Sequence, residues 1–146
     1  MVFAGTLDTV TAPTHTDTDV VAADVTLRGK RAVLPVNRRH ELAVVPLDSR
    51  VKVGEAIVEP GWIGLIPEGA DELPFETEHK QARMLLVGGV PLGEPLVMWW
   101  NFVARNRDEI TAAYHDWAEH TDRFTAVPTR IPRIDAPVPP WLAAPQ

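Results

Sequence analysis

The segment ELAVVPLDSRVKVGEAIVEPGWIGLIPEG, residues 41–69, decides the fold class. It contains short runs of valine, isoleucine and leucine, separated by Gly, Pro and Asp-Ser, which favour turns. Similar runs continue outward from it in both directions. The expected strands are residues 24–27, 32–36, 41–47, 51–53, 55–58, 62–66, 72–76 and 82–87. Short strands at regular spacing indicate a β-sandwich or a β-barrel.

One helix is expected after these strands. Asn106 and Glu109 have the spacing of a capping box, a common start of a helix. The apolar residues that follow at helical spacing are Ile110, Ala113, Tyr114 and Trp117. We therefore expect a helix over residues 107–120, packed on the barrel by this stripe.

The two ends of the chain differ from its middle. Six of the 14 prolines lie between Pro128 and Pro145, and proline fixes φ and lacks a backbone donor. Residues 128–146 are therefore expected to form an extended Pro-rich strap, anchored by Trp141 and Leu142. Residues 1–22 are rich in Thr and Asp and are expected to be a flexible lead-in. The barrel and its helix would then occupy residues 23–127.

Length, charge and composition exclude several classes of protein. The 146 residues predict one domain, and the net charge of −6 disfavours direct binding of nucleic acid. The chain has no cysteine, hence no disulfide or thiolate metal site. No apolar run is long enough to span a membrane, and the N-terminus does not have the pattern of a secretory signal. By elimination, a cytoplasmic protein is expected.

A longer motif resembles a known family. Residues 83–110, RMLLVGGVPLGEPLVMWWNFVARNRDEI, resemble the C-terminal signature of the pirin family, with its Gly-Gly-x-Pro, Glu-Pro and WWNFV-type motifs. The DRF at Asp122–Phe124 and the Pro-rich finish agree with it. The resemblance covers residues 24–146. It implies an all-β fold: a cupin-type jelly-roll β-barrel with one C-terminal α-helix and an extended Pro-rich tail.

Pirins are bicupins, with two jelly-roll barrels in tandem and chains about twice this length. Their N-terminal cupin holds one iron through three histidines and a glutamate. The family is linked to quercetin 2,3-dioxygenase activity and, in eukaryotes, to a transcriptional cofactor role. This chain resembles the C-terminal cupin only, so the resemblance places the iron in a half that these residues do not include.

The cupin motifs test whether this half keeps a metal site. The second motif, G-x5-P-x-G-x2-H, is matched by Gly61, Pro67 and Gly69, with Glu72 at the histidine position. The first motif, H-x-H-x3–4-E-x6-G, is poorly matched near residues 35–42, and no two histidines of the chain stand one residue apart. Iron needs several converging imidazole or carboxylate ligands. We therefore expect no metal, no cofactor and no catalytic residue in this chain.

The remaining polar candidates have structural explanations that we favour. His40 beside Glu41 could be a relic ligand pair, but a solvent-facing entry to a hairpin is favoured. His115 and Glu119 are expected to form an exposed i, i+4 pair on the helix rather than a zinc motif with His120. Three neighbouring carboxylates could form a cluster for acid–base chemistry, but a solvated acidic rim of a hairpin is favoured. They are Glu68, Asp71 and Glu72.

The aromatic block before the helix is a candidate interaction surface. In a strand, Trp99 would face one side and Met98 and Trp100 the other, so one side needs a cover. The helix, the strap or another protein surface could provide it. We expect self-association or binding to a separate N-terminal cupin half. The candidate residues are Met98, Trp99, Trp100, Phe102 and Trp141.

Three functions follow from these observations. The favoured one is a metal-free cupin that acts as a structural or interaction module. The second is part of a quercetin 2,3-dioxygenase-like iron enzyme whose catalytic N-terminal cupin is absent from this chain. The third is a transcription-associated cofactor that acts through protein partners.

Overall fold

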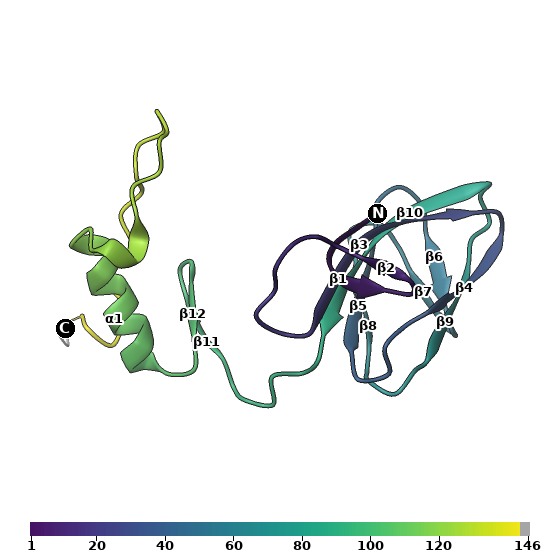
Figure 1. Cartoon of the computed structure of the whole chain (residues 1–146), viewed down its shortest axis with the longest axis horizontal. Coiled ribbons are helices and arrows are strands. Elements are labelled where there is room, and N and C mark those ends of the chain that lie inside the picture. Colours follow the sequence, from purple (N-terminus) through teal and green to yellow (C-terminus); the bar gives the residue numbers. More distant parts are fainter. Residues whose placement is uncertain (144–146) are drawn as a thin grey trace. The chain divides into compact units, whose positions relative to one another are not determined.

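The computed structural model describes residues 1–143 and divides the chain into two compact units, Met1–Leu92 and Gly93–Gln146 (Figure 1). The sequence predicted one domain in which the helix packs on the barrel. The residues after Gly93 bury an apolar core of their own, around Phe102 and Ile110. That the helix packs on the barrel stays a prediction.

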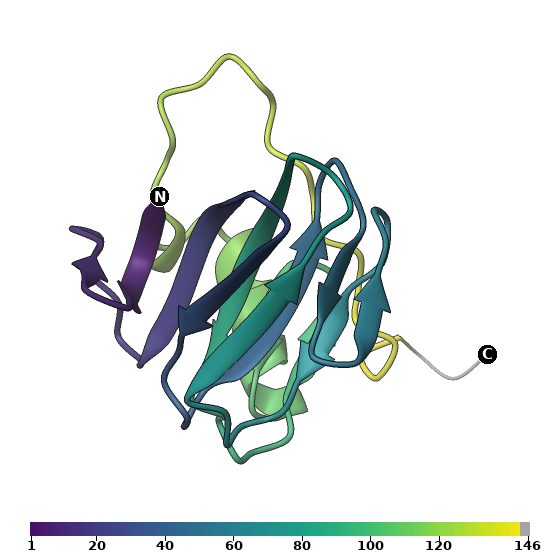
Figure 2. The same cartoon turned by 90° about the vertical axis from the view of Figure 1, so that its right-hand side faces the viewer.

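The first unit consists of two antiparallel sheets. The six-stranded sheet has the order β2-β1-β3-β10-β5-β8, and the four-stranded sheet has the order β4-β9-β6-β7 (Figure 2). The strands are β1 (Val2–Leu7), β2 (Val10–Thr11), β3 (Val20–Arg28), β4 (Arg31–Pro35), β5 (Glu41–Pro46), β6 (Val51–Val53), β7 (Ala56–Val58), β8 (Gly64–Ile66), β9 (Glu72–Glu76) and β10 (Gln81–Gly89).

The core of this unit lies between the two sheets. Along β5, β9 and β10 every second side chain is buried, as expected for strands with one face on a core. Val44 and Met84 of the six-stranded sheet meet Val51 and Phe75 of the four-stranded sheet in one cluster. The expected jelly-roll fold of cupin type, with a single helix after the strands, is confirmed.

The first residues of the chain belong to the barrel. β1 pairs with β3, and the N-terminal ammonium of Met1 donates to the Asp24 carbonyl oxygen at 2.6 Å. Gly5 allows this pairing, because it has φ of 64° and a Cβ there would lie 1.7 Å from the Val20 carbonyl oxygen. Half of the flexible lead-in expected over residues 1–22, namely residues 2–7, 10–11 and 20–22, therefore belongs to the sheet.

The second unit contains a hairpin and the helix. It is built from β11 (Val97–Trp99), β12 (Phe102–Ala104), α1 (Arg107–Ala118) and a 3₁₀ turn, Asp122–Phe124. Ile110 and Ala113 of the stripe predicted for the helix are buried by the hairpin and by the C-terminal segment of the same unit, and Tyr114 and Trp117 are half-buried against them. The helix ends in a Schellman-type cap, with His120 at φ 59° and the Thr121 N–H donating to the Asp116 carbonyl.

The aromatic block MWWNF, residues 98–102, is part of a hairpin and not a single strand. Trp100 and Asn101 form its turn, and Trp100 has φ of 53°, in the region that favours glycine. The chain reverses there, so Met98 lies opposite Val103 on one exposed face, while Phe102 enters the core. The alternation expected for one continuous strand therefore stops at Trp99.

The Pro-rich segment runs without helix or strand from residue 125 to residue 139. Indole N–H groups hold its backbone: Trp117 donates to the Ile134 carbonyl at 3.0 Å, and Trp99 donates to the Pro137 carbonyl at 3.1 Å. Trp141 packs edge-on against Trp99. Residues 144–146 of the expected strap lie outside the described residues.

Candidate functional site

The positions of the second cupin motif surround β8. Gly61 and Gly69 occupy the turns on either side of it, with φ of 92° and 117°, values that glycine adopts without strain. Pro67 follows the strand directly and is exposed. Glu72, at the histidine position of the motif, begins β9 opposite Pro35 and is also exposed.

The interior of the barrel is apolar. The side chains with no exposed surface are Val44, Val51, Phe75, Ala82, Met84 and Leu86. An iron centre needs imidazole or carboxylate ligands that converge on a polar opening. Among residues 1–143, no three His, Cys, Asp or Glu side chains lie close enough together to hold a metal ion. The side chains inside this barrel therefore do not fit an iron centre of the kind that the family resemblance implies for the other cupin. That the chain binds no metal stays a prediction.

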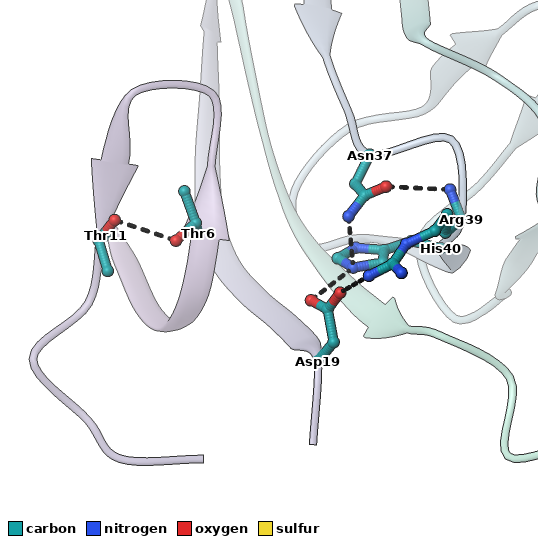
Figure 3. A network of polar contacts seen from close by, with 6 residues as sticks. All are labelled: Thr6, Thr11, Asp19, Asn37, Arg39 and His40. Atoms are coloured by element: carbon teal, nitrogen blue, oxygen red, sulfur yellow. Dashed lines mark hydrogen bonds and ion pairs between the residues drawn. The ribbon is translucent and has the colours of Figure 1, made fainter. Parts of the chain in front are cut away.

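His40 is the buried polar side chain at the poorly matched first motif, and the expectation that it faces solvent is wrong. It is 4% exposed, and its Nε2 lies 3.0 Å from Oδ1 of Asp19 and 3.3 Å from Nδ2 of Asn37 (Figure 3). The other Asp19 oxygen accepts from Nη2 of Arg39 at 2.6 Å. The Asn37 side chain in turn accepts from the Arg39 backbone N–H.

Sheet topology explains why this pair forms. Asp19 directly precedes β3 and His40 directly precedes β5, and both strands pair with β10. Gly89 of β10 lies opposite Val20 on one side and opposite the first residue of β5 on the other. The two preceding side chains therefore reach the same end of the sheet. The contact spans 21 residues of sequence, so no local pattern could have indicated it.

The electrostatics of this network favour a charged Asp19. The hydrogen bond from His40, followed by that from Arg39, lowers the pKa of the Asp19 carboxyl below its ordinary value, against the opposing effect of burial. Because a carboxylate only accepts, the His40 Nε2–H is the donor in this contact.

A His–Asp pair can orient a general base. Here the imidazole is 4% exposed, and within residues 1–143 its Nε2–H donates to Asp19, with no hydroxyl or thiol nucleophile within hydrogen-bonding distance. The arrangement ties the start of β3 to the loop before β5, which is a structural role.

The other polar candidates lie at the surface. His115 is exposed, and Glu119 caps the end of α1. His120 is drawn into a contact that the sequence did not indicate, with its Nδ1 2.6 Å from Nη1 of Arg133. The acidic candidates, all exposed, are Glu68, Asp71 and Glu72.

The candidate interaction residues lie in the second unit, and four of the five pack against their neighbours. Phe102 is buried, and Trp100 packs edge-on against it. Trp99 and Trp141 contact each other, and the Trp141 indole N–H donates to the Thr111 hydroxyl at 2.9 Å. Met98 alone of these five is largely exposed, at 70%.

Within residues 1–143, no helix has the length and apolarity needed to cross a bilayer.

Comparison with known proteins gives consistent relatives. Residues 22–124 match the pirin C-terminal cupin domain. A Pseudomonas aeruginosa protein, provisionally named a quercetin 2,3-dioxygenase, is 31% identical over 140 residues, covering 94% of this chain and 44% of the relative. A crystal structure of quercetin 2,3-dioxygenase from Acinetobacter baumannii superposes with a TM-score of 0.82 at 30% identity, covering 95% of this chain and 47% of that one.

These matches agree with the fold and with the motif at residues 83–110. The chain spans less than half the length of the relatives it matches. A domain match over most of the chain, together with the jelly-roll architecture, settles the family. The chain belongs to the pirin family and carries its C-terminal cupin domain.

Proposed function

We propose that this chain is a structural and interaction module: a metal-free cupin that docks on a second copy of itself or on a separate N-terminal cupin half. We further propose that it works in the cytoplasm, a reducing compartment that suits a chain without cysteine. The observation that carries the docking proposal is the exposed apolar edge of the six-stranded sheet.

This edge is formed by β8, the last strand in the order β2-β1-β3-β10-β5-β8. Trp62, Ile63 and Leu65 are exposed by 72%, 63% and 73% along this edge. An edge strand with free backbone groups and large apolar side chains is a template for pairing with another chain. Soluble proteins reserve such patches for contacts with partners.

The apolar character continues from this edge into the sheet. Leu65 lies opposite Ala43 of β5, Ala43 lies opposite Val87 of β10, and Val87 lies opposite Ala22 of β3. These residues alternate with the core residues of their strands, so the row lies on the face away from the core. An apolar row that continues inward from an apolar edge gives a partner more area to bury than the edge alone.

Light scattering coupled to size exclusion tests self-association. We expect the chain at tens of micromolar to elute as a dimer or larger species, and Leu65→Lys to shift it to the monomer. Val33→Lys, at a position that is 58% exposed in the four-stranded sheet, is the matched control and is expected to leave the assembly intact. A clean monomer would contradict self-association, and equal effects of the two variants would contradict the role of β8.

The names of the relatives favour a second function, in which the chain is part of a quercetin 2,3-dioxygenase. Its own barrel offers no fitting iron ligands, so the catalytic half would lie elsewhere. Elemental analysis of the purified chain, followed by a quercetin consumption assay with added ferrous iron, separates the two functions. Stoichiometric iron in this chain alone would overturn the metal-free module.

A further inference from the structure

The second unit carries an open cavity of about 650 Å³ between the hairpin turn, the end of α1 and the Pro-rich segment. Its volume lies in the range of pockets that take small organic ligands. Nothing in the proposed docking role uses it. Its aromatic lining consists of Trp100, Trp117 and Phe124.

The aromatic walls support one another. Trp100 packs edge-on against Trp117 at 5.4 Å between ring centroids, and Trp117 packs edge-on against Phe124 at the same distance. Trp100 is also held at φ 53°, a strained conformation for a large side chain. Backbone strain that the surrounding structure maintains is typical of ligand-binding positions. The walls suit a flat aromatic molecule.

One permanent charge, that of Arg133, lines this cavity, and no carboxylate does. Its guanidinium carbon lies 3.6 Å from the ring centroid of Trp117, and its Nη2 donates to the Trp117 carbonyl at 2.6 Å. Among residues 1–143, Arg39, Arg83 and Arg105 each contact a carboxylate, whereas Arg133 contacts none. Its Nε is buried without a hydrogen-bond partner.

His120 adds a neutral polar group. A guanidinium has donors only, so the His120 Nδ1 that lies 2.6 Å from Arg133 Nη1 must accept. The imidazole is then in the tautomer with its proton on Nε2, a second donor at the lining.

Charge decides the class of ligand. An aromatic cluster can bind cations, but the Arg133 guanidinium already occupies the face of Trp117 and repels a second positive charge. An anion gains the attraction of an arginine that no carboxylate of residues 1–143 neutralises. We propose that this cavity binds a planar aromatic carboxylate, with its rings against Trp100 and Phe124 and its carboxylate toward Arg133, beside Trp117.

The test uses the full chain with two probes of one ring system, 2-naphthoate and the neutral 2-naphthalenemethanol, in isothermal titration calorimetry. We expect saturable binding of 2-naphthoate and an affinity for the alcohol that is lower by about tenfold or more. A difference of this size is expected for the loss of a charge-assisted hydrogen bond. Arg133→Met should abolish this preference. Arg130→Met changes an exposed arginine that does not line the cavity and should preserve it.

Indole N–H signals in ¹H–¹⁵N spectra locate the probe without any change to Arg133. The signals of Trp100 and Trp117 should move with 2-naphthoate, whereas that of Trp62, in the first unit, should not. The proposal is overturned by the absence of saturable binding, by equal affinity for acid and alcohol, by loss of the preference in Arg130→Met, or by movement of the Trp62 signal alone.

Discussion

His40 Nε2 lies 3.0 Å from Oδ1 of Asp19, and this contact joins the starts of two strands that flank β10 in the same sheet. The imidazole is buried, while the carboxylate side chain is 44% exposed. The pair therefore connects the rim of the barrel to its interior. Loss of either partner should affect stability, each in its own way.

His40→Ala should lower the free energy of unfolding by about 1–2 kcal/mol, because it removes a buried hydrogen bond and leaves a small void. Denaturant unfolding at neutral pH measures this. His79→Ala is the control, because His79 is exposed, and it should change the free energy by less than about 0.5 kcal/mol. Equal stability of the two variants would contradict a structural role for His40.

Asp19 should make stability depend on pH. Its pKa in the folded chain is lowered from 3.8, so its contribution is present above that value and is lost as the pH falls through the folded pKa. Asp19→Asn should therefore be less stable than the natural chain at neutral pH, and the difference should shrink below about pH 4. Denaturant titrations across this range measure it, and a difference that grows on acidification would contradict the network.

Short apolar runs separated by turn residues made the strands of the barrel predictable. Residues 72–76, at the expected bounds, form β9 with Leu73 and Phe75 inside, because alternation of side chains is a local property of the strand. β1 was missed because its Thr- and Gly-containing sequence gives no such signal. Pairing with β3, a contact distant in the sequence, makes this segment a strand. The hairpin at Trp100 was missed because tryptophan is disfavoured at φ above 0°, and Asn101 lacks the glycine that usually accompanies it in a two-residue hairpin turn.

The candidate site was less predictable than the fold. The positions of Gly61, Pro67 and Gly69 in the loops around β8 follow from a local motif, and so could be read from spacing. The burial of His40 and the contact between His120 and Arg133 depend on which segments the topology brings together. Residues 19 and 40, or 120 and 133, carry no sequence signal that links them.

Gly88 is a position where the sheet requires the absence of a side chain. A Cβ there would lie 2.0 Å from the carbonyl oxygen of Glu41, a backbone atom that cannot rotate away. Gly88→Ala should therefore cost about 3 kcal/mol or more, the upper range for overpacking. Gly29→Ala, where φ is 97° but no atom lies within 4 Å, is the control and should cost about 1–2 kcal/mol. Thermal or denaturant unfolding compares them, and equal costs would exclude the close approach as the cause.

Asn106 caps α1, and its side chain accepts from the Glu109 backbone N–H at 2.9 Å. Asn106→Ala should lower the stability of the second unit by about 1 kcal/mol, whereas Asn106→Ser should retain most of it. Fluorescence of the tryptophans around α1 reports unfolding of this unit. If the Ser and Ala variants unfold at the same denaturant concentration, the cap does not contribute.

Trp141 holds the end of the Pro-rich segment chiefly through the edge-on packing against Trp99 and the hydrogen bond to Thr111, with the Arg107 guanidinium also over its ring. Trp141→Ala loses these contacts and should expose the backbone of residues 125–140 to protease, because extended segments are cleaved when their anchors are lost. Trp141→Phe keeps the aromatic contact and loses the hydrogen bond, so its cleavage rate should fall between those of the natural chain and Trp141→Ala. Leu142→Ala, at a position 41% exposed, is the neighbouring control and should be cleaved at the natural rate. Faster cleavage of Leu142→Ala than of Trp141→Ala would assign the anchor to leucine, since each residue can hold the segment only through the contacts it makes.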